Sequence, residues 1–173
     1  MVATDRKYDI LDLESGKLDR RIFVDLTVEE NLDVGRQPPR RFHDAKPAPA
    51  WTPDRLYRLF PNLAEMTDRL GGRMSGGEQQ MLTVARTLMG NPYLVLLDEP
   101  SEGVAPVIVE QMAHMILELK EQGVSILLSE QNMHFAELVS DRAYVLEKGQ
   151  IRYQASMEEL AANDEVRRAY LSV

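Results

Sequence analysis

Two short groups of residues in the middle of the chain have types and spacings that could do chemistry. The first, Ser-Gly-Gly-Glu from Ser75 to Glu78, opens a segment with helical apolar periodicity. A serine with a glutamate three residues later predicts a helix capping box. The N-terminus of a helix offers N–H groups and the positive end of its dipole to an anion, and glycines let a phosphate approach closely.

The second group is the acidic pair Asp98-Glu99, directly after the apolar run from Tyr93 to Leu97. Two carboxylates at the exit of a buried strand suit Mg²⁺ and a water molecule to be deprotonated. Taken singly, the first group is ordinary helix capping and the second an ordinary solvated loop. Their order and spacing together favour a site that handles phosphate.

The elements that must position these groups can be read from the apolar pattern. A helix after Ser75 ends at Gly90-Asn91-Pro92, and short apolar strands run from Tyr93 to Leu97 and from Val124 to Leu128. Both strands read as central parallel strands that need neighbours and cover on both faces, and they bring Asp98 and Gln131 to the same edge of a sheet. The inward face of the helix consists of Met81, Leu82, Ala85, Leu88 and Met89.

Capping residues, prolines and glycines predict where the remaining elements begin and end. A capping box at residues 27–30 starts a helix that Gly35 ends, and Thr52-Pro53 starts another. A helix begins at Pro106 and stops at Gly123. The C-terminal part reads as a hairpin over residues 143–153, a capping box at residues 156–159 and a last helix over residues 163–171.

Composition limits the function classes. The chain has 173 residues, 44% hydrophobic and 28% charged, which is ordinary for a globular domain. The net charge of −8 argues against a nucleic-acid surface. The sequence contains no cysteine, so disulfide frameworks and thiolate metal sites are excluded. Its apolar runs are too short to cross a bilayer, so any membrane role is expected to come through a partner.

With these motifs in view, the chain resembles the ATP-binding-cassette (ABC) ATPases. Residues 74–80, MSGGEQQ, look like the family's signature motif, and residues 93–100, YLVLLDEP, look like its Walker B strand. The downstream strings DEPSEGVAP and LLSEQN are most similar to the ATPase subunits of branched-chain amino-acid importers. The resemblance covers roughly residues 20–173.

The resemblance implies a partial P-loop NTPase fold of the α/β class: a mostly parallel sheet flanked by helices, with a helical signature subdomain. It implies an unmatched leader over residues 1–19, the helical subdomain over 20–91, and the Walker B and switch part over 92–173. Its cofactors would be ATP and Mg²⁺. The implied site residues are Glu99 and Gln131 in catalysis, Asp98 for the metal, and Ser75, Gly76, Gly77, Glu78, Ser101 and Gly103 for the nucleotide.

The resemblance also implies partners. These are a second ABC ATPase subunit and the membrane subunits of a transporter, with no nucleic acid and no direct insertion into the membrane. The expected location is cytoplasmic, at the inner face of the cell membrane. Gln131 stands where most of the superfamily has a histidine; glutamine can donate a hydrogen bond to a γ-phosphate but cannot carry a proton.

The sequence departs from the family in two places. Leu18 stands where the family has its Q-loop glutamine, and no Gly-x-x-x-x-Gly-Lys-Ser/Thr phosphate loop occurs. The fragment ESGK at residues 14–17 lacks the first glycine and the final hydroxyl. The chain therefore looks like the back two-thirds of a cassette, from a truncated gene or a misplaced start.

Three functions compete on this evidence. The first is an importer ATPase subunit in truncated form. The second is a non-catalytic remnant or interaction module that supplies the signature motif in trans. The third, a DNA-repair ATPase of the same superfamily, is the weakest, because this acidic, cysteine-free chain has neither the long coiled coils nor the zinc motifs of those proteins. Without a phosphate loop, we expect the chain alone to be inactive in ATP hydrolysis.

Overall fold

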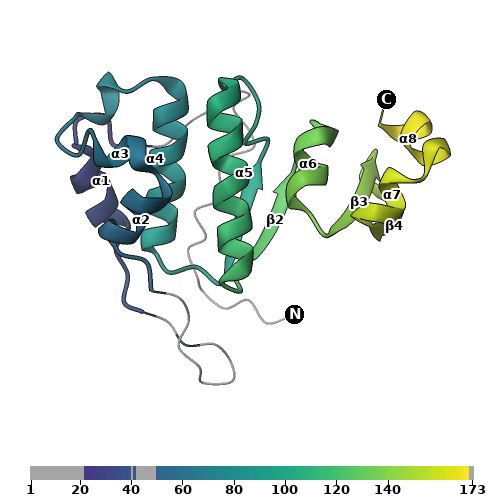
Figure 1. Ribbon diagram of the computed structural model, residues 1–173, viewed down its shortest axis with the longest axis horizontal. Helices are drawn as coiled ribbons and strands as arrows, with labels where there is room; N and C mark the ends of the chain where they lie inside the picture. The colour runs from purple at the N-terminus through teal and green to yellow at the C-terminus, as the bar shows by residue number, and fades with distance from the viewer. Residues whose placement is uncertain (1–21, 40, 42–49, 172–173) are drawn as a thin grey trace. The chain divides into compact units, whose positions relative to one another are not determined.

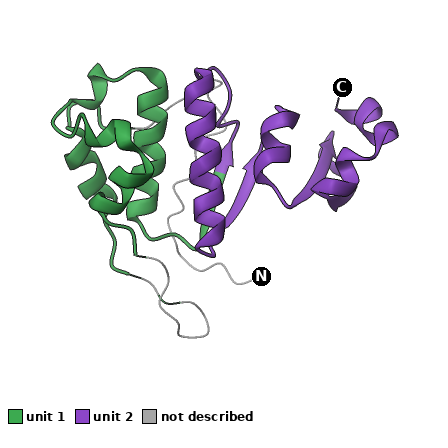
Figure 2. Cartoon of the chain, in the orientation of Figure 1, with its two compact units in different colours: residues 1–96 green, residues 97–173 purple. Residues whose placement is uncertain are grey.

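The computed structural model describes residues 22–39, 41 and 50–171. The predicted leader, Leu18 and the Glu14–Lys17 fragment lie outside the described residues. The chain divides into two compact units, residues 1–96 and 97–173 (Figure 2). The boundary falls inside strand β1 (Leu94–Asp98), whose last two residues belong to unit 2 and lie beside β2 (Ser125–Ser129).

Unit 1 is built from helices packed around α4 (Gly76–Met89) (Figure 1). Helix α1 (Val28–Gly35) and the short helix α3 (Pro61–Ala64) both contact α4, and α2 (Pro53–Leu59) contacts α3. A 3₁₀ turn, η1 (Gly71–Arg73), leads into α4. The predicted inward face of α4 is confirmed, since all five of its apolar residues are buried: Met81, Leu82, Ala85, Leu88 and Met89.

Local sequence explains where these helices begin and end. Thr27 and Glu30 form the predicted capping box of α1, and Pro53 occupies the first turn of α2 behind the Thr52 cap. The apolar face from Leu56 to Leu63 is split between α2 and α3. The break comes at Pro61, because proline has no N–H to continue the ladder of α2.

A buried asparagine closes unit 1 at the end of α4. Asn91 is 3% exposed and has a positive φ of 50°. Its Oδ1 accepts a hydrogen bond from the Trp51 amide (2.8 Å), and its Nδ2 donates to the Gln37 carbonyl (2.7 Å). One side chain thus joins α4 to the chain on both sides of residues 38–50.

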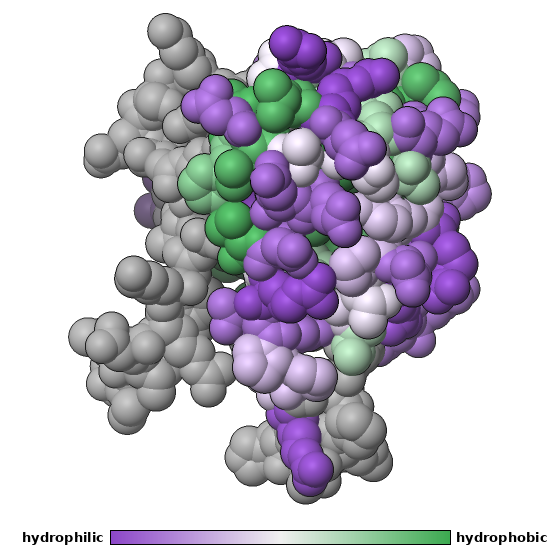
Figure 3. All heavy atoms as spheres, turned by 90° about the vertical axis from the view of Figure 1, so that its left-hand side faces the viewer, coloured by the Kyte–Doolittle hydropathy of each residue, from purple (hydrophilic) through white to green (hydrophobic). Residues whose placement is uncertain are grey.

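One face of unit 1 carries exposed apolar side chains. Figure 3 shows apolar residues gathered left of the centre of this face, with hydrophilic residues to their right. The large apolar residues exposed near α1 are Phe23, Val24 and Val34. No helix among the described residues is both long enough and apolar enough to span a membrane.

Unit 2 has helix α5 (Pro106–Glu121) against β2 and α6 (Met133–Val139). The predicted start at Pro106 is confirmed, and Gly123 follows the helix with a φ of 79°. The cover that both faces of these strands need is incomplete in the described residues. In β1 the side chains alternate between exposed and buried, and in β2 Leu127 is 60% exposed.

The predicted hairpin is formed by β3 (Arg142–Glu147) and β4 (Gln150–Ser156), which pair antiparallel. Its inner face joins α7 (Met157–Ala161) in a small core of Val145, Met157 and Leu160. Ser156 and Glu159 form the predicted capping box of α7, and Asn163 caps the last helix, α8 (Asp164–Tyr170). The outer face of the hairpin exposes Leu146 (67%) and Ile151 (60%).

Candidate nucleotide site

The Ser-Gly-Gly-Glu group forms the N-terminus of α4 in unit 1. Ser75 is the N-cap; its hydroxyl accepts a hydrogen bond from the Glu78 amide (3.4 Å), and the Glu78 carboxylate accepts one from the Ser75 amide (2.6 Å). Gly76 and Gly77 therefore occupy N1 and N2, positions whose N–H groups have no acceptor within the helix. Arg69 lies 3.6 Å from the Glu78 carboxylate. This geometry can present amide N–H groups to an anion.

The acidic pair lies in unit 2, where β1 ends. Asp98 is exposed. Glu99 has a φ of 44°, a left-handed conformation that is rare for a side chain with a Cβ and is held by the hydrogen bond from its amide to the Ser129 carbonyl (2.8 Å). This bond also ties the end of β1 to the end of β2.

The structure brings Glu99 and Gln131 together. The side-chain amide of Gln131 donates a hydrogen bond to Glu99 Oε1. This bond is the main cause of the lowered pKa of Glu99, and a contact with the Glu102 carboxyl lowers it further. The same contact with Glu99, together with the negative charge of Glu99, raises the pKa of Glu102. Glu99 is therefore held as a carboxylate, and Glu102 is the more easily protonated partner.

The remaining candidates follow β1 in the same unit. Ser101 is half-buried, and its amide donates a hydrogen bond to the Glu130 carboxylate (3.3 Å). Gly103 has a φ of 65°, which glycine adopts without strain, and there is open space where a Cβ would stand. Sequence reasoning missed Glu102 and Glu130. The available signal was the presence of a further acidic residue on each of the loops that follow the strands.

Mg²⁺ suits the residues present. No three His, Cys, Asp or Glu side chains come together as a complete metal site within the part of the chain that is described. A single exposed carboxylate such as Asp98 is nevertheless the usual protein contribution to a Mg²⁺ ion that is held mainly by phosphate oxygens and water.

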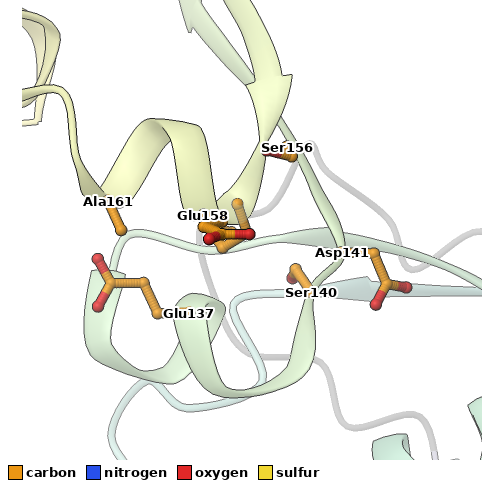
Figure 4. A pocket seen from close by; sticks show the side chains of 7 residues that line it. Glu137, Ser140, Asp141, Ser156, Glu158 and Ala161 are labelled. Atoms are coloured by element: carbon orange, nitrogen blue, oxygen red, sulfur yellow. The ribbon is translucent and has the colours of Figure 1, made fainter.

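A surface pocket of about 420 Å³ in unit 2 contains none of the candidate residues. It lies where α6 and the loop after it meet α7 (Figure 4). Three of its lining side chains are acidic: Glu137, Asp141 and Glu158. This pocket is therefore separate from the candidate site, which remains at the ends of β1 and β2.

Comparison with known proteins decides the family. The model of the ABC transporter family matches residues 12–102, which include the α4 cap and the acidic pair. The chain belongs to the ABC transporter family. This confirms the family resemblance found from the MSGGEQQ and YLVLLDEP strings.

Curated relatives match most of the chain. The chain is 46% identical to the high-affinity branched-chain amino acid transport ATP-binding protein BraG of Pseudomonas aeruginosa, over 88% of this chain and 63% of BraG. It is 33% identical to the lipopolysaccharide export system ATP-binding protein LptB of Haemophilus influenzae, over 87% of this chain and 61% of LptB. The chain thus spans less than two thirds of the length of these relatives.

Solved structures confirm the α/β cassette fold. A nucleotide-free ATP-binding cassette from an ABC transporter matches with a TM-score of 0.64 and 25% identity, over 86% of this chain and 63% of that chain. A dimeric cassette bound to ADP and phosphate matches with a TM-score of 0.63 and 17% identity, over 82% of this chain and 61% of that chain. The second likeness concerns the fold alone.

Proposed function

We propose that the chain is the ATP-binding and ATP-hydrolysing part of an importer for branched-chain or related amino acids. The observation that carries the proposal is the hydrogen bond from the Gln131 amide to the Glu99 carboxylate at the ends of two neighbouring strands. The 46% identity to BraG supports the choice of solute class. The proposed partners are a second cassette and membrane subunits at the inner face of the cell membrane.

In this proposal Glu99 is the general base. As a carboxylate it can accept a proton from an attacking water; the hydrogen bond from Gln131 that lowers its pKa orients the group and makes it a weaker base. Gln131 fixes the orientation of that carboxylate and retains a second N–H for a phosphate oxygen. Asp98 would hold Mg²⁺, which supplies charge neutralisation of the phosphates. Ser101 and Gly103 are proposed nucleotide contacts on the loop after β1.

A second candidate function rests on the cap of α4. Ser75 to Glu78 form a closed capping box that leaves two glycine amides at the helix start, and such a terminus binds an anion. No phosphate-loop string occurs in the printed sequence. The signature group would therefore close over ATP that a cassette with a phosphate loop holds, which makes this chain an interaction module acting in trans.

One phosphate-release assay tests both functions. The chain is measured alone and then titrated, at fixed ATP, into a branched-chain importer cassette that carries a phosphate loop. Turnover by the chain alone at about 1 per second or more, the low end of the range for enzymes, would support the first function. Turnover well below this rate, which we expect of a chain without a phosphate loop, would favour the second. We expect added chain to lower the activity of the cassette, because a mixed pair has one competent site at most.

Two variants separate the candidates. Gly77→Asp places a negative charge where a phosphate must sit, so loss of the titration effect supports action in trans. Glu99→Gln removes the base, so an effect of this variant in either assay supports chemistry at the acidic pair. If both variants match the wild-type chain in both assays, neither function stands.

A further inference from the structure

The carboxylate of Glu130 divides its two oxygens between two loops of unit 2. Oε1 accepts hydrogen bonds from the backbone amides of Gln131 and Asn132, each at 3.0 Å. Oε2 accepts one from the Ser101 amide at 3.3 Å. Ser101 follows β1 and the other two residues follow β2. One half-buried side chain therefore joins the loops that carry the candidate chemistry.

The residues that donate these bonds are close in sequence to the groups proposed to react. Ser101 is two residues after Glu99, and Gln131 is the residue whose side chain contacts Glu99. Asn132, whose amide donates to the same carboxylate, is also the N-cap of α6, where its side chain accepts a hydrogen bond from the Phe135 amide (3.2 Å). Bonds from backbone amides to an ionised carboxylate are stronger than bonds between neutral groups. One carboxylate, that of Glu130, thus holds the start of α6, the loop after β2 and the loop after β1.

We propose that Glu130 is a positioning residue that sets the Gln131 side chain against the Glu99 carboxylate. The inference rests on the proposed function at the acidic pair. It assigns Glu130 no contact with nucleotide or metal. Its role is to keep the loops after β1 and β2 at the one spacing at which the Gln131 amide can orient the base.

Replacement of Glu130 by glutamine breaks the link on one side only. Glutamine has nearly the same shape, but one of its two terminal groups is an NH₂ donor. The side-chain oxygen of the new glutamine accepts from two amides when it faces Gln131 and Asn132, but from only one when it faces Ser101. The first orientation is therefore favoured. The NH₂ group then meets the Ser101 N–H, donor against donor. The bonds within the loop after β2 persist, while the bond between the two loops is lost.

The experiment uses the full chain labelled with ¹⁵N, as wild type, Glu130→Gln and Glu110→Gln, a matched charge change on the exposed face of α5. Amide hydrogen exchange is followed at Ser101, Gln131 and Asn132, together with the side-chain NH₂ signals of Gln131. In Glu130→Gln we expect exchange at Ser101 to rise about tenfold, the effect of losing about one hydrogen bond. Exchange at the other two backbone amides should rise less than at Ser101, because their acceptor loses its charge but their hydrogen bonds remain, and the Gln131 NH₂ signals should shift.

A purely structural role of Glu130 would lower the melting temperature without a specific change in the Gln131 NH₂ signals. The inference is overturned if those signals, or exchange at Ser101, are the same in Glu130→Gln and Glu110→Gln. Both readouts are taken without nucleotide. A negative phosphate-release assay would therefore remove the proposed function and leave the link between the loops standing, whereas unchanged spectra would remove the link whatever the assay shows.

Discussion

The side chain of Asn31 binds both polar groups of the Phe23 backbone. Its Oδ1 accepts a hydrogen bond from the Phe23 amide (2.9 Å), and its Nδ2 donates to the Phe23 carbonyl (3.0 Å). The same Nδ2 lies within hydrogen-bond distance of the Leu26 and Thr27 carbonyls (3.2 and 2.9 Å). Asn31 is fully buried, so one residue of α1 determines the path of the chain that enters that helix.

Replacing Asn31 by aspartate should therefore destabilise unit 1. Aspartate keeps the shape and one acceptor but loses the NH₂ donors, which leaves carbonyl groups unsatisfied and places a charge among them. We expect a loss of at least about 1–3 kcal/mol in the free energy of unfolding, measured by urea denaturation. Glu29→Gln, an exposed change on the same helix, is the control. Equal midpoints for the two variants would contradict the role assigned to Asn31.

Gly35 marks a close approach between α1 and α4. A Cβ at this position would lie 2.3 Å from the carbonyl oxygen of Arg86, a backbone atom that cannot rotate away. Gly35→Ala should thus push the two helices apart and cost about 1–3 kcal/mol of stability. Thermal unfolding followed by circular dichroism checks this, with the exposed Val34→Ala as control. A melting temperature of Gly35→Ala no lower than that of the control would show that α1 can shift away from α4 without loss of stability.

The capping boxes at Glu30 and Glu159 give the fold a defined dependence on pH. Hydrogen bonds from the backbone of Thr27 and Ser156 lower the pKa of these two carboxyls from the ordinary value of 4.5. A carboxyl with a lowered folded-state pKa stabilises the fold fully above its unfolded-state pKa. That contribution is lost as the pH falls through the folded value.

Glu159→Gln tests the direction of this pH dependence of stability. Glutamine can still accept the hydrogen bond but has no charge to protonate, so the variant should lose less stability than wild type between about pH 5 and about pH 3. Melting temperatures measured across this range give the comparison. Glu158→Gln, a neighbouring exposed change, should follow wild type. Parallel curves for wild type and Glu159→Gln would exclude the cap as a source of acid sensitivity.

The outer face of the β3–β4 hairpin should promote self-association. Leu146 and Ile151 are paired across the two strands and are mostly exposed, beside the half-exposed Tyr144. Replacing Leu146 and Ile151 together by lysine should raise the monomer fraction, because charges on an open apolar face oppose pairing. Sedimentation velocity over a range of concentrations measures this fraction. Tyr170→Ser, an exposed change on α8, serves as control, and a double variant that associates as the control does would contradict the prediction.

Much of the fold follows from local signals that a sequence displays directly. Several of these signals act within one helical turn. They are the capping boxes at Ser75 and Ser156, the proline at the start of α5 and the glycine at the end of α1. They could be predicted because capping depends on residues three positions apart. The burial of every second residue in β1, in place of a strand buried throughout, depends on packing at long range, which periodicity does not specify.

The candidate site could be predicted only in part, for the same physical reason. Asp98 and Gln131 were expected at one sheet edge because each follows an apolar strand. The contact between Glu99 and Gln131 joins residues far apart in sequence, and the three amide bonds of Glu130 depend on the exact spacing of two loops. The same holds for Asn31 and Asn91, whose side chains act on backbone groups that carry no sequence signal.

The hydrogen bonds of Asn91 make residues 38–50 a permissive place for insertions. Gln37 and Trp51 are both held by a residue that lies outside this segment, so the helices before and after it are fixed without reference to its length. The entropic cost of a longer loop rises slowly, by about 0.6 kcal/mol for each doubling of length. A reporter peptide or a small affinity domain inserted between Gln37 and Trp51 should therefore leave α1, α2 and α4 in register, and so allow the chain to be tagged away from both candidate motifs.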